Sequence, residues 1–215
     1  MFTSRTRVLV ADDHVLVAEA LQKLLSVDFD VVGIVYDGQR LLRAVQTLAP
    51  QVVLVDINMP VLNGLHAAER IKRQMPQIKI IYVTMTSDPE IVSESLKRGA
   101  DGYVLKTSAP SELVMAVHCA LKGERYVCGE LLPRGIGPSS NVTALPSNKQ
   151  RELTDRQLEI LQLLAEGCSM KEVANVLNLT TRTVAFHKYR VMRRLHLQND
   201  SEVIQYAVRH HIIAA

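Results

Sequence analysis

The sequence is poor in cysteine and has no long apolar run, and each shortage excludes a class of protein. It holds three cysteines, Cys119, Cys128 and Cys168, an odd number without the paired spacing of a metal site. We expect reduced, structural thiols with no zinc or redox role. No apolar stretch approaches the length that spans a bilayer, and the chain does not open with a charged region followed by an apolar signal core. We therefore expect a soluble, cytoplasmic protein without a membrane partner.

Charges of the two signs are nearly balanced, and the small basic excess lies toward the C-terminus. Residues 1–130 hold 14 Lys and Arg against 15 Asp and Glu, whereas residues 149–215 hold 10 against 7. This difference weakly favours a polyanionic partner for the C-terminal part. A chain of 215 residues is long for one domain and suits two, of about 125 and about 65 residues.

The first part of the chain alternates short apolar runs with amphipathic segments. The apolar runs lie at residues 8–11, 31–35, 52–55, 79–84 and 102–105. The amphipathic segments lie at residues 15–25, 41–48, 65–75, 91–98 and 113–122. Five strand-then-helix units predict an α/β domain over residues 1–122, with a doubly wound, five-stranded parallel sheet. The periodicity then fades in residues 123–149, which are rich in Gly, Pro and Ser at 133–141, and we interpret them as a linker.

Helical signals without any strand signal resume in residues 150–215. One apolar stripe at helical spacing consists of Leu158, Ile160, Leu161, Leu163 and Leu164. Ser169, Thr180 and Ser201 stand where they can cap three further helices. The pattern predicts a small all-α domain of four helices.

Polar side chains stand at the ends of the predicted strands. Asp12 and Asp13 follow the first run, Asp56 follows the third, Thr84 ends the fourth and Lys106 follows the fifth. In a doubly wound sheet the ligand site lies outside the carboxyl ends of the strands, so we expect these side chains to meet there. Each has a second interpretation when taken alone, because an Asp here is often only a helix cap and a Lys only a solvated charge. Five such residues in this order favour a shared pocket.

The chemistry of this pocket follows from its charges. Three converging carboxylates repel one another unless a cation neutralises them, and Mg²⁺ suits such oxygen ligands, with the backbone carbonyl of Asn58 as a further candidate. A carboxylate beside Mg²⁺ and a lysine can attack a phosphoryl group, which predicts an acyl phosphate on Asp56. Thr84 and Lys106 can then contact the phosphoryl oxygens.

Four segments of this part spell a familiar pattern: "VLVADDH", "VVLVDINMPVLNG", "IYVTM" and "GYVLKT". They resemble the flavodoxin-like receiver domain of bacterial two-component response regulators. The resemblance implies that Asp56 is the phosphoacceptor in a phosphorelay, that the Asp12 and Asp13 pair lies at the metal, and that a sensor histidine kinase is the partner. It assigns phosphate sensing to Thr84, Lys106 and Tyr103, although Tyr103 also fits a residue that only packs against the sheet.

The C-terminal part has the element order of a helix-turn-helix, in which the later helix enters the DNA major groove. Residues 180–196 carry no acid and five bases, Arg182, Lys188, Arg190, Arg193 and Arg194. Charge alone would also fit an ordinary basic surface helix. The segment "LTDRQLEILQLLAEGCSMKEVANVLNLTTRTVAFHKYRVMRRL" resembles LuxR-type DNA-binding domains, and with the receiver it resembles NarL/FixJ-type transcriptional regulators.

By this resemblance, residues 181–194 form the recognition helix and residues 201–213 the last helix, which often serves dimerisation. The expected contacts to double-stranded DNA come from Thr181, Arg182, Lys188, Tyr189, Arg190, Arg193 and Arg194. The expected dimer contacts come from Val203, Ile204, Ala207 and Val208. Ala185 and Phe186 depart from the family, since neither side chain can hydrogen-bond a base, although Phe186 could touch a thymine methyl. For His187 a packed position is favoured over base reading.

Two hypotheses for the function remain. The favoured one is a DNA-binding transcriptional regulator controlled by phosphorylation of Asp56, which pairs as a homodimer when phosphorylated or bound to DNA. It would not be an enzyme beyond phosphorylating and dephosphorylating its own aspartate. The alternative is an interaction protein whose receiver docks a partner without phosphate and whose C-terminal domain is weakened for DNA by Ala185 and Phe186.

Overall fold

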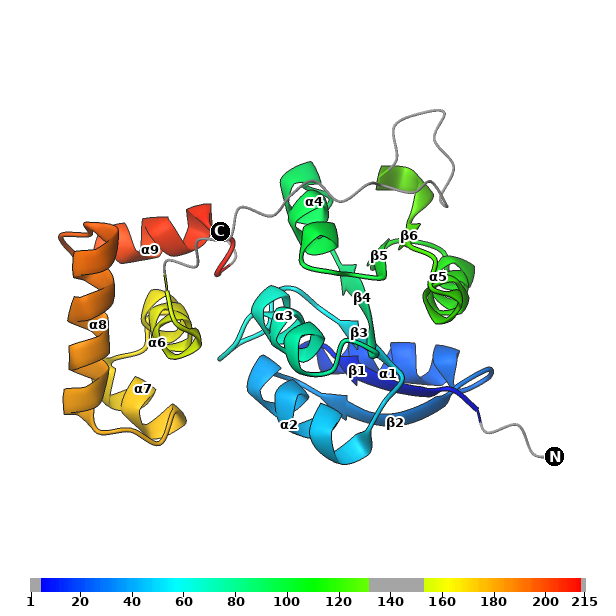
Figure 1. Cartoon of the computed structure of the whole chain (residues 1–215), viewed down its shortest axis with the longest axis horizontal. Coiled ribbons are helices and arrows are strands. Elements are labelled where there is room, and N and C mark those ends of the chain that lie inside the picture. Colours follow the sequence, from blue (N-terminus) through cyan, green and yellow to red (C-terminus); the bar gives the residue numbers. More distant parts are fainter. Residues whose placement is uncertain (1–4, 132–152, 214–215) are drawn as a thin grey trace. The chain divides into compact units, whose positions relative to one another are not determined.

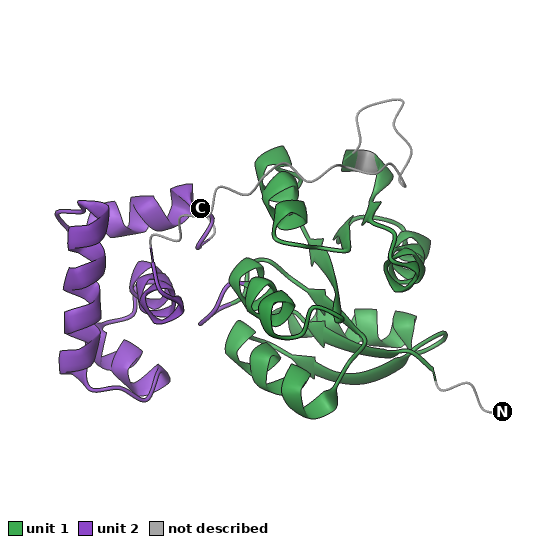
Figure 2. Ribbon diagram, viewed as in Figure 1, with its two compact units in different colours: residues 1–59, 64–147 green, residues 60–63, 148–215 purple. Residues whose placement is uncertain are grey.

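The computed structural model describes residues 5–131 and 153–213 (Figure 1). The chain divides into two compact units, residues 1–59 with 64–147 and residues 60–63 with 148–215 (Figure 2). The Gly-, Pro- and Ser-rich stretch that we interpret as linker, at 133–141, lies outside the described residues. No helix within 5–131 or 153–213 is long and apolar enough to cross a membrane.

The first unit is built on a sheet of parallel strands in the order β2-β1-β3-β4-β5-β6. The strands are β1 (Arg7–Ala11), β2 (Asp30–Val35), β3 (Val52–Val55), β4 (Lys79–Thr84), β5 (Gly102–Leu105) and β6 (Tyr126–Val127). Continuous apolar runs form the inner strands because helices cover both of their faces, and every residue of β3 and β5 is buried. The edge strand β2 is only partly buried. The sheet is therefore the doubly wound parallel sheet that the sequence predicts.

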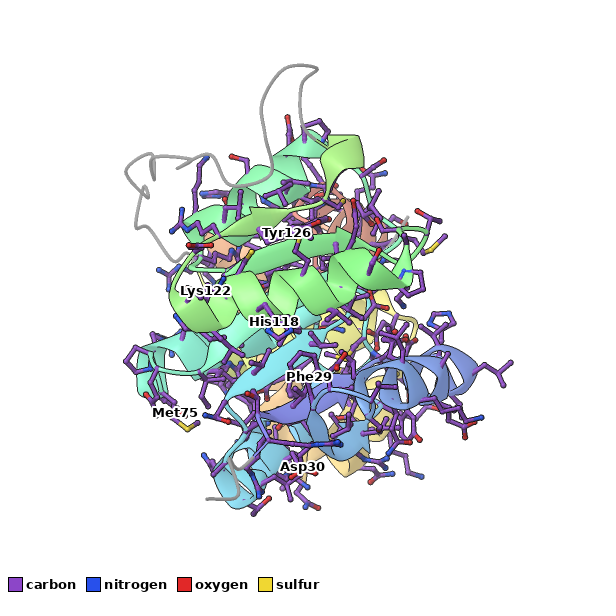
Figure 3. All side chains as sticks on the ribbon, turned by 90° about the vertical axis from the view of Figure 1, so that its right-hand side faces the viewer. Phe29, Asp30, Met75, His118, Lys122 and Tyr126 are labelled. Atoms are coloured by element: carbon purple, nitrogen blue, oxygen red, sulfur yellow. The ribbon has the colours of Figure 1, made fainter. Side chains whose placement is uncertain are left out.

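Five helices cover this sheet, with α1 and α5 on one face and α2, α3 and α4 on the other (Figure 1). They are α1 (Val15–Leu25), α2 (Gly38–Leu48), α3 (Gly64–Gln74), α4 (Pro89–Lys97) and α5 (Pro110–Lys122). Local signals set their ends: the Asp88 carboxylate accepts the Glu90 amide before α4, and Gly123 closes α5 at a φ of 82°. On the α5 face Phe29 lies beside His118, with their ring centroids 5.3 Å apart (Figure 3).

The sixth strand corrects the predicted five. The Tyr126 amide donates to the carbonyl of Asp101, and the Cys128 amide donates to the carbonyl of Tyr103, both at 3.0 Å. A short 3₁₀ turn, η1 (Gly129–Leu131), follows the strand. Residues 126–131 fall within the predicted linker because two strand residues are too few to show an alternating pattern. They belong to the first unit, and Cys128 is buried there as a free thiol.

The second unit contains α6 (Asp155–Ala165), α7 (Met170–Val176), α8 (Thr181–Leu195) and α9 (Asp200–Arg209). Two apolar clusters hold these helices together, and α6 contributes to both. Ile160 and Leu163 pack against α7 and against Val184 of α8. Leu161 packs against Val191 of α8 and against α9. The apolar stripe of the sequence is thus the centre of the small domain.

The structure confirms two of the three predicted helix caps and corrects the third. Ser169 and Thr180 each accept an amide from the first turn of the following helix. The N-cap of α9 is Asn199, whose side chain accepts the Glu202 amide at 3.0 Å, so Ser201 lies inside the helix rather than at its start. Asn and Ser cap helices equally well, so composition could not separate two candidates this close together.

We expect Asn199→Ala to loosen α9, because it removes the oxygen that accepts the Glu202 amide. A cap of this kind contributes about 1 kcal/mol, which corresponds to roughly fivefold faster amide exchange across the helix. Hydrogen exchange of the full chain, followed by mass spectrometry, measures this directly. Ser201→Ala is the matched control and should leave the exchange of α9 unchanged. If Ser201→Ala accelerated the exchange more than Asn199→Ala, Ser201 would be the N-cap instead.

Candidate functional site

Backbone hydrogen bonds just beyond the strands bring the predicted pocket residues together. The Asp12 amide donates to the Val35 carbonyl, the Asp56 amide to the Ala11 carbonyl and the Lys106 amide to the Thr84 carbonyl, at 2.8 to 3.0 Å. Each bond continues the parallel register by one residue past a strand end. The side chains therefore leave the sheet at one edge, where the order of strands reverses between β1 and β3.

The charged groups of this pocket are in direct contact. The Lys106 ammonium donates a hydrogen bond to Asp56 Oδ2 at 2.8 Å and lies 2.8 Å from Asp12 Oδ2. The carboxylates of Asp12 and Asp56 are buried, whereas the Asp13 side chain is 31% exposed. Lys106 contacts two of the three carboxylates, so negative charge is in excess at this site.

Burial and the neighbouring charges shift the pKa values of two groups in this pocket. Burial raises the pKa of the Asp56 carboxyl above its ordinary value, and this outweighs the hydrogen bond and charge of Lys106, which lower it. For Lys106 burial lowers the pKa, but the hydrogen bonds and charges of Asp12 and Asp56 outweigh it and raise the pKa overall. The ammonium therefore stays charged, and a further cation would help to hold Asp56 in its ionised form.

The carboxylates fit such a cation. Ligand atoms of Asp12, Asp13, His14 and Asp56 all lie within 4.8 Å of one another. Asp13 Oδ1 is buried and accepts no hydrogen bond from the residues that the structure describes, although the His14 ring lies 2.9 Å away. Carboxylate oxygens are the ligands that a hard divalent ion such as Mg²⁺ prefers. Asn58 is exposed two residues after Asp56, and the role of its carbonyl stays a prediction.

The predicted phosphate-sensing residues lie at the same edge. Thr84 ends β4 as a buried residue, and its hydroxyl oxygen accepts the Thr86 amide at 3.3 Å. Tyr103 is buried in β5, and its hydroxyl donates to the Thr86 carbonyl at 2.8 Å. Thr84 and Tyr103 are thus joined through one residue of the loop after β4. The inward position of Tyr103 satisfies its hydroxyl, as a buried tyrosine requires.

Two residues near the pocket were missed as site residues in the sequence. His14 lies beside the acidic pair, and its amide donates to Asp12 Oδ1 at 2.9 Å; the sequence triplet Asp-Asp-His was its only signal. Gly64 begins α3, where a Cβ atom would lie 1.9 Å from the Asp56 carbonyl oxygen. Only glycine lets the helix approach the phosphoacceptor candidate this closely, and a glycine at a turn does not by itself reveal such an approach.

In the second unit, α8 presents most of the predicted DNA contacts to solvent. The exposed ones are Thr181, Arg182, Tyr189, Arg190, Arg193 and Arg194. Lys188 differs, because its side chain is 13% exposed and its ammonium lies 2.6 Å from a carboxylate oxygen of Asp200 in α9. His187 is half-buried, in agreement with the packed position expected for it.

The predicted dimer contacts in α9 divide into two groups. Val203 and Ala207 are buried in the cluster that joins α9 to α6 and α8, so within one chain these two side chains are already packed, and their role in a dimer stays a prediction. Their spacing of four residues marks the face of α9 that packs on its own domain, and a core face and a dimer face have the same period. Ile204, which is 42% exposed, and the half-buried Val208 remain accessible.

Comparisons with known proteins agree with this geometry. The response regulator receiver domain matches residues 8–118, and the luxR family of bacterial regulatory proteins matches residues 151–207. The oxygen regulatory protein NreC of Staphylococcus aureus (strain bovine RF122 / ET3-1) is 34% identical over 210 residues, which cover 94% of this chain and 97% of the relative.

Solved structures of similar proteins cover nearly the whole chain. A structure of the RcsB response regulator of Salmonella typhimurium has a TM-score of 0.57 at 29% identity and covers 96% of this chain and 100% of its own. A structure of the RcsB-DNA complex has the same TM-score and identity and covers 94% of this chain and 98% of its own.

The chain belongs to the two-component response regulators, with a receiver domain followed by a LuxR-type DNA-binding domain. Its function is that of a DNA-binding transcriptional regulator in a two-component system. Neither matching family is a classical enzyme family.

We expect Gly64→Ala to destabilise the receiver, because a Cβ atom 1.9 Å from the Asp56 carbonyl oxygen forces the backbone apart. Overpacking of this kind costs about 1–3 kcal/mol, which lowers the melting temperature of a domain of this size by several degrees. Calorimetry of the full chain measures the shift. Gly129→Ala is the matched control, since the nearest atom to its Cβ is 3.9 Å away; equal melting of both variants would refute the role given to Gly64.

Proposed function

We propose that Asp56 accepts a phosphoryl group from a sensor histidine kinase and that the resulting acyl phosphate controls DNA binding by the C-terminal domain. The observation that carries this proposal is the contact of one ammonium, Lys106, with the buried carboxylates of Asp12 and Asp56. We further propose that residues 1–131 form the receiver, which extends the predicted 1–122 by β6 and η1, and that residues 150–215 form the DNA-binding domain.

In the proposed transfer, a carboxylate oxygen of Asp56 attacks the phosphorus of a phosphohistidine, the N–P bond breaks, and the departing imidazole takes up a proton. The Lys106 ammonium pairs with the Asp56 oxygen before transfer and with a phosphoryl oxygen afterwards, so it neutralises negative charge in both states. Asp12, Asp13, Asp56 and the Asn58 carbonyl would hold Mg²⁺, which offsets the charge on the transferring oxygens. Attack of water on the acyl phosphate returns the free carboxylate and phosphate.

The signal leaves the pocket through the loop after β4. Thr84 and Tyr103 both bond to Thr86 in the present structure. A phosphoryl group that accepts a hydrogen bond from the Thr84 hydroxyl would draw Thr84 toward Asp56. Because Thr84 and Tyr103 both bond to Thr86, the loop after β4 and the Tyr103 side chain would then have to change position. We propose that this adjustment favours pairing of two chains as a homodimer, as fits the RcsB dimers bound to DNA.

Acetyl phosphate with Mg²⁺ tests the phosphoacceptor directly. We expect the full chain to gain the mass of one phosphoryl group and to bind its DNA more tightly, whereas Asp56→Asn does neither because it has no nucleophilic carboxylate. Intact-mass spectrometry and gel-shift titration measure the two effects. Asp13→Asn is a comparison variant that keeps the nucleophile and should be phosphorylated more slowly. Phosphoryl transfer to the Asp56→Asn chain would place the acceptor elsewhere.

Salt dependence tests the DNA-binding helix and separates a DNA-binding regulator from an interaction protein. Removing one side chain that binds a DNA phosphate should reduce the slope of log affinity against log salt by roughly 0.9. We expect this for Arg193→Ala and for Arg194→Ala, whose side chains are exposed on α8. Arg209→Ala, an exposed arginine in the last turn of α9, is the matched control and should keep the slope. Binding that does not weaken with salt in the unaltered chain would favour the interaction protein.

A further inference from the structure

The outward face of α8 carries an apolar ring among its cations. Arg182, Phe186, Tyr189, Arg190 and Arg193 follow one another at intervals that place them on one side of the helix, and all are exposed. Val184 and Val191 are buried on the opposite side, in the two apolar clusters of the domain. Packing therefore fixes which side of α8 is available to DNA, and Phe186 stands within that side.

Phe186 is exposed, but two neighbouring side chains contact its ring. Its side chain is 58% exposed, a large fraction for a phenylalanine in a small folded domain. The Arg190 guanidinium lies over the ring, 5.9 Å from its centroid, and the His187 ring meets it edge-on with centroids 5.5 Å apart. These contacts hold the ring on the helix surface while leaving much of it in water. The ring would therefore give up little conformational freedom when it makes a further contact.

The major groove offers one kind of partner for such a ring. Phosphates and the donor and acceptor groups of base edges cannot pair with an apolar side chain, but the C5-methyl group of thymine can. Ala185, the neighbouring residue, ends at Cβ and carries no long polar side chain that would reach a base in its place. Arg190 keeps its edge donors available for DNA while it covers the ring.

We propose that Phe186 reads the C5-methyl group of a thymine at one position of each half-site and so sets part of the sequence preference of this regulator. The proposal rests on the DNA-binding function of the domain and adds to it the residue and the chemical group that are recognised. Arg190 acts as a positioning residue, because it holds the ring rather than supplying the apolar contact.

The test selects binding sites from a random DNA duplex library. The full chain, treated with acetyl phosphate and Mg²⁺, is used as the unaltered protein and as Phe186→Ala. Thymines of the selected site are then replaced one at a time by deoxyuridine, which removes the methyl group and nothing else. For the unaltered chain we expect binding about fourfold weaker at one position of each half-site, the effect of one buried methyl group. For Phe186→Ala we expect no effect of the same replacement.

Two further variants keep the result interpretable. Phe186→Leu retains an apolar side chain and should retain part of the deoxyuridine effect. Tyr189→Ala removes the other exposed aromatic residue of this face, which is itself an expected DNA contact. Whatever its overall affinity, the ratio of its affinities for the thymine and deoxyuridine duplexes should equal that of the unaltered chain. An unchanged thermal unfolding curve of each full-chain variant, followed by circular dichroism, shows that its helical domain is folded.

Three results would overturn the proposal. One is an unaltered chain that binds every deoxyuridine duplex as tightly as the thymine duplex. Another is a Phe186→Ala chain that loses as much affinity as the unaltered chain at the same position. Failure of the unaltered chain to enrich any sequence would overturn the DNA-binding function as well, so the two failures are distinguishable.

Discussion

The contact of the Lys106 ammonium with two buried carboxylates is the interaction on which the receiver depends. Asp12 and Asp56 follow neighbouring strands, and Lys106 follows β5, two strands away from β3. Without a cation between them, two buried carboxylates would repel each other at the point where the sheet changes its winding direction. The ion pair therefore holds the carboxyl ends of β1, β3 and β5 together and keeps the two carboxylates close to each other. Because the carboxylates and the ammonium are so close, the site is suited to bind a phosphoryl group.

Much of this pocket could be predicted from the chain alone, because a buried parallel strand shows itself as an apolar run and ends where a polar residue begins. Asp12, Asp56, Thr84 and Lys106 were placed correctly at one edge for that reason. Gly64 was not recognised, because its importance lies in the distance to a backbone oxygen that precedes it by eight residues. Local sequence patterns carry periodicity and chemical type, but they do not carry such close approaches.

In the helical domain, too, local sequence patterns predict the elements but not which residues contact one another. The four helices and the caps at Ser169 and Thr180 follow from local signals, and the structure confirms them. The packing of Val203 and Ala207 in the core of their own domain was not foreseen, since apolar residues four apart in a helix mark a packed face and not what packs on it. The ion pair of Lys188 with Asp200 was not foreseen, because it joins two helices and has no trace in the spacing of either.

The short strand β6 has a consequence for any isolated receiver. It pairs with β5, the strand that carries Tyr103 and leads to Lys106, so β5 is an interior strand in the intact chain. A fragment that stopped at the end of α5 would leave the backbone donors and acceptors of β5 uncovered, and an open apolar strand of this kind invites pairing with another molecule. Self-association of such a fragment would then reflect the cut rather than the natural assembly of the regulator.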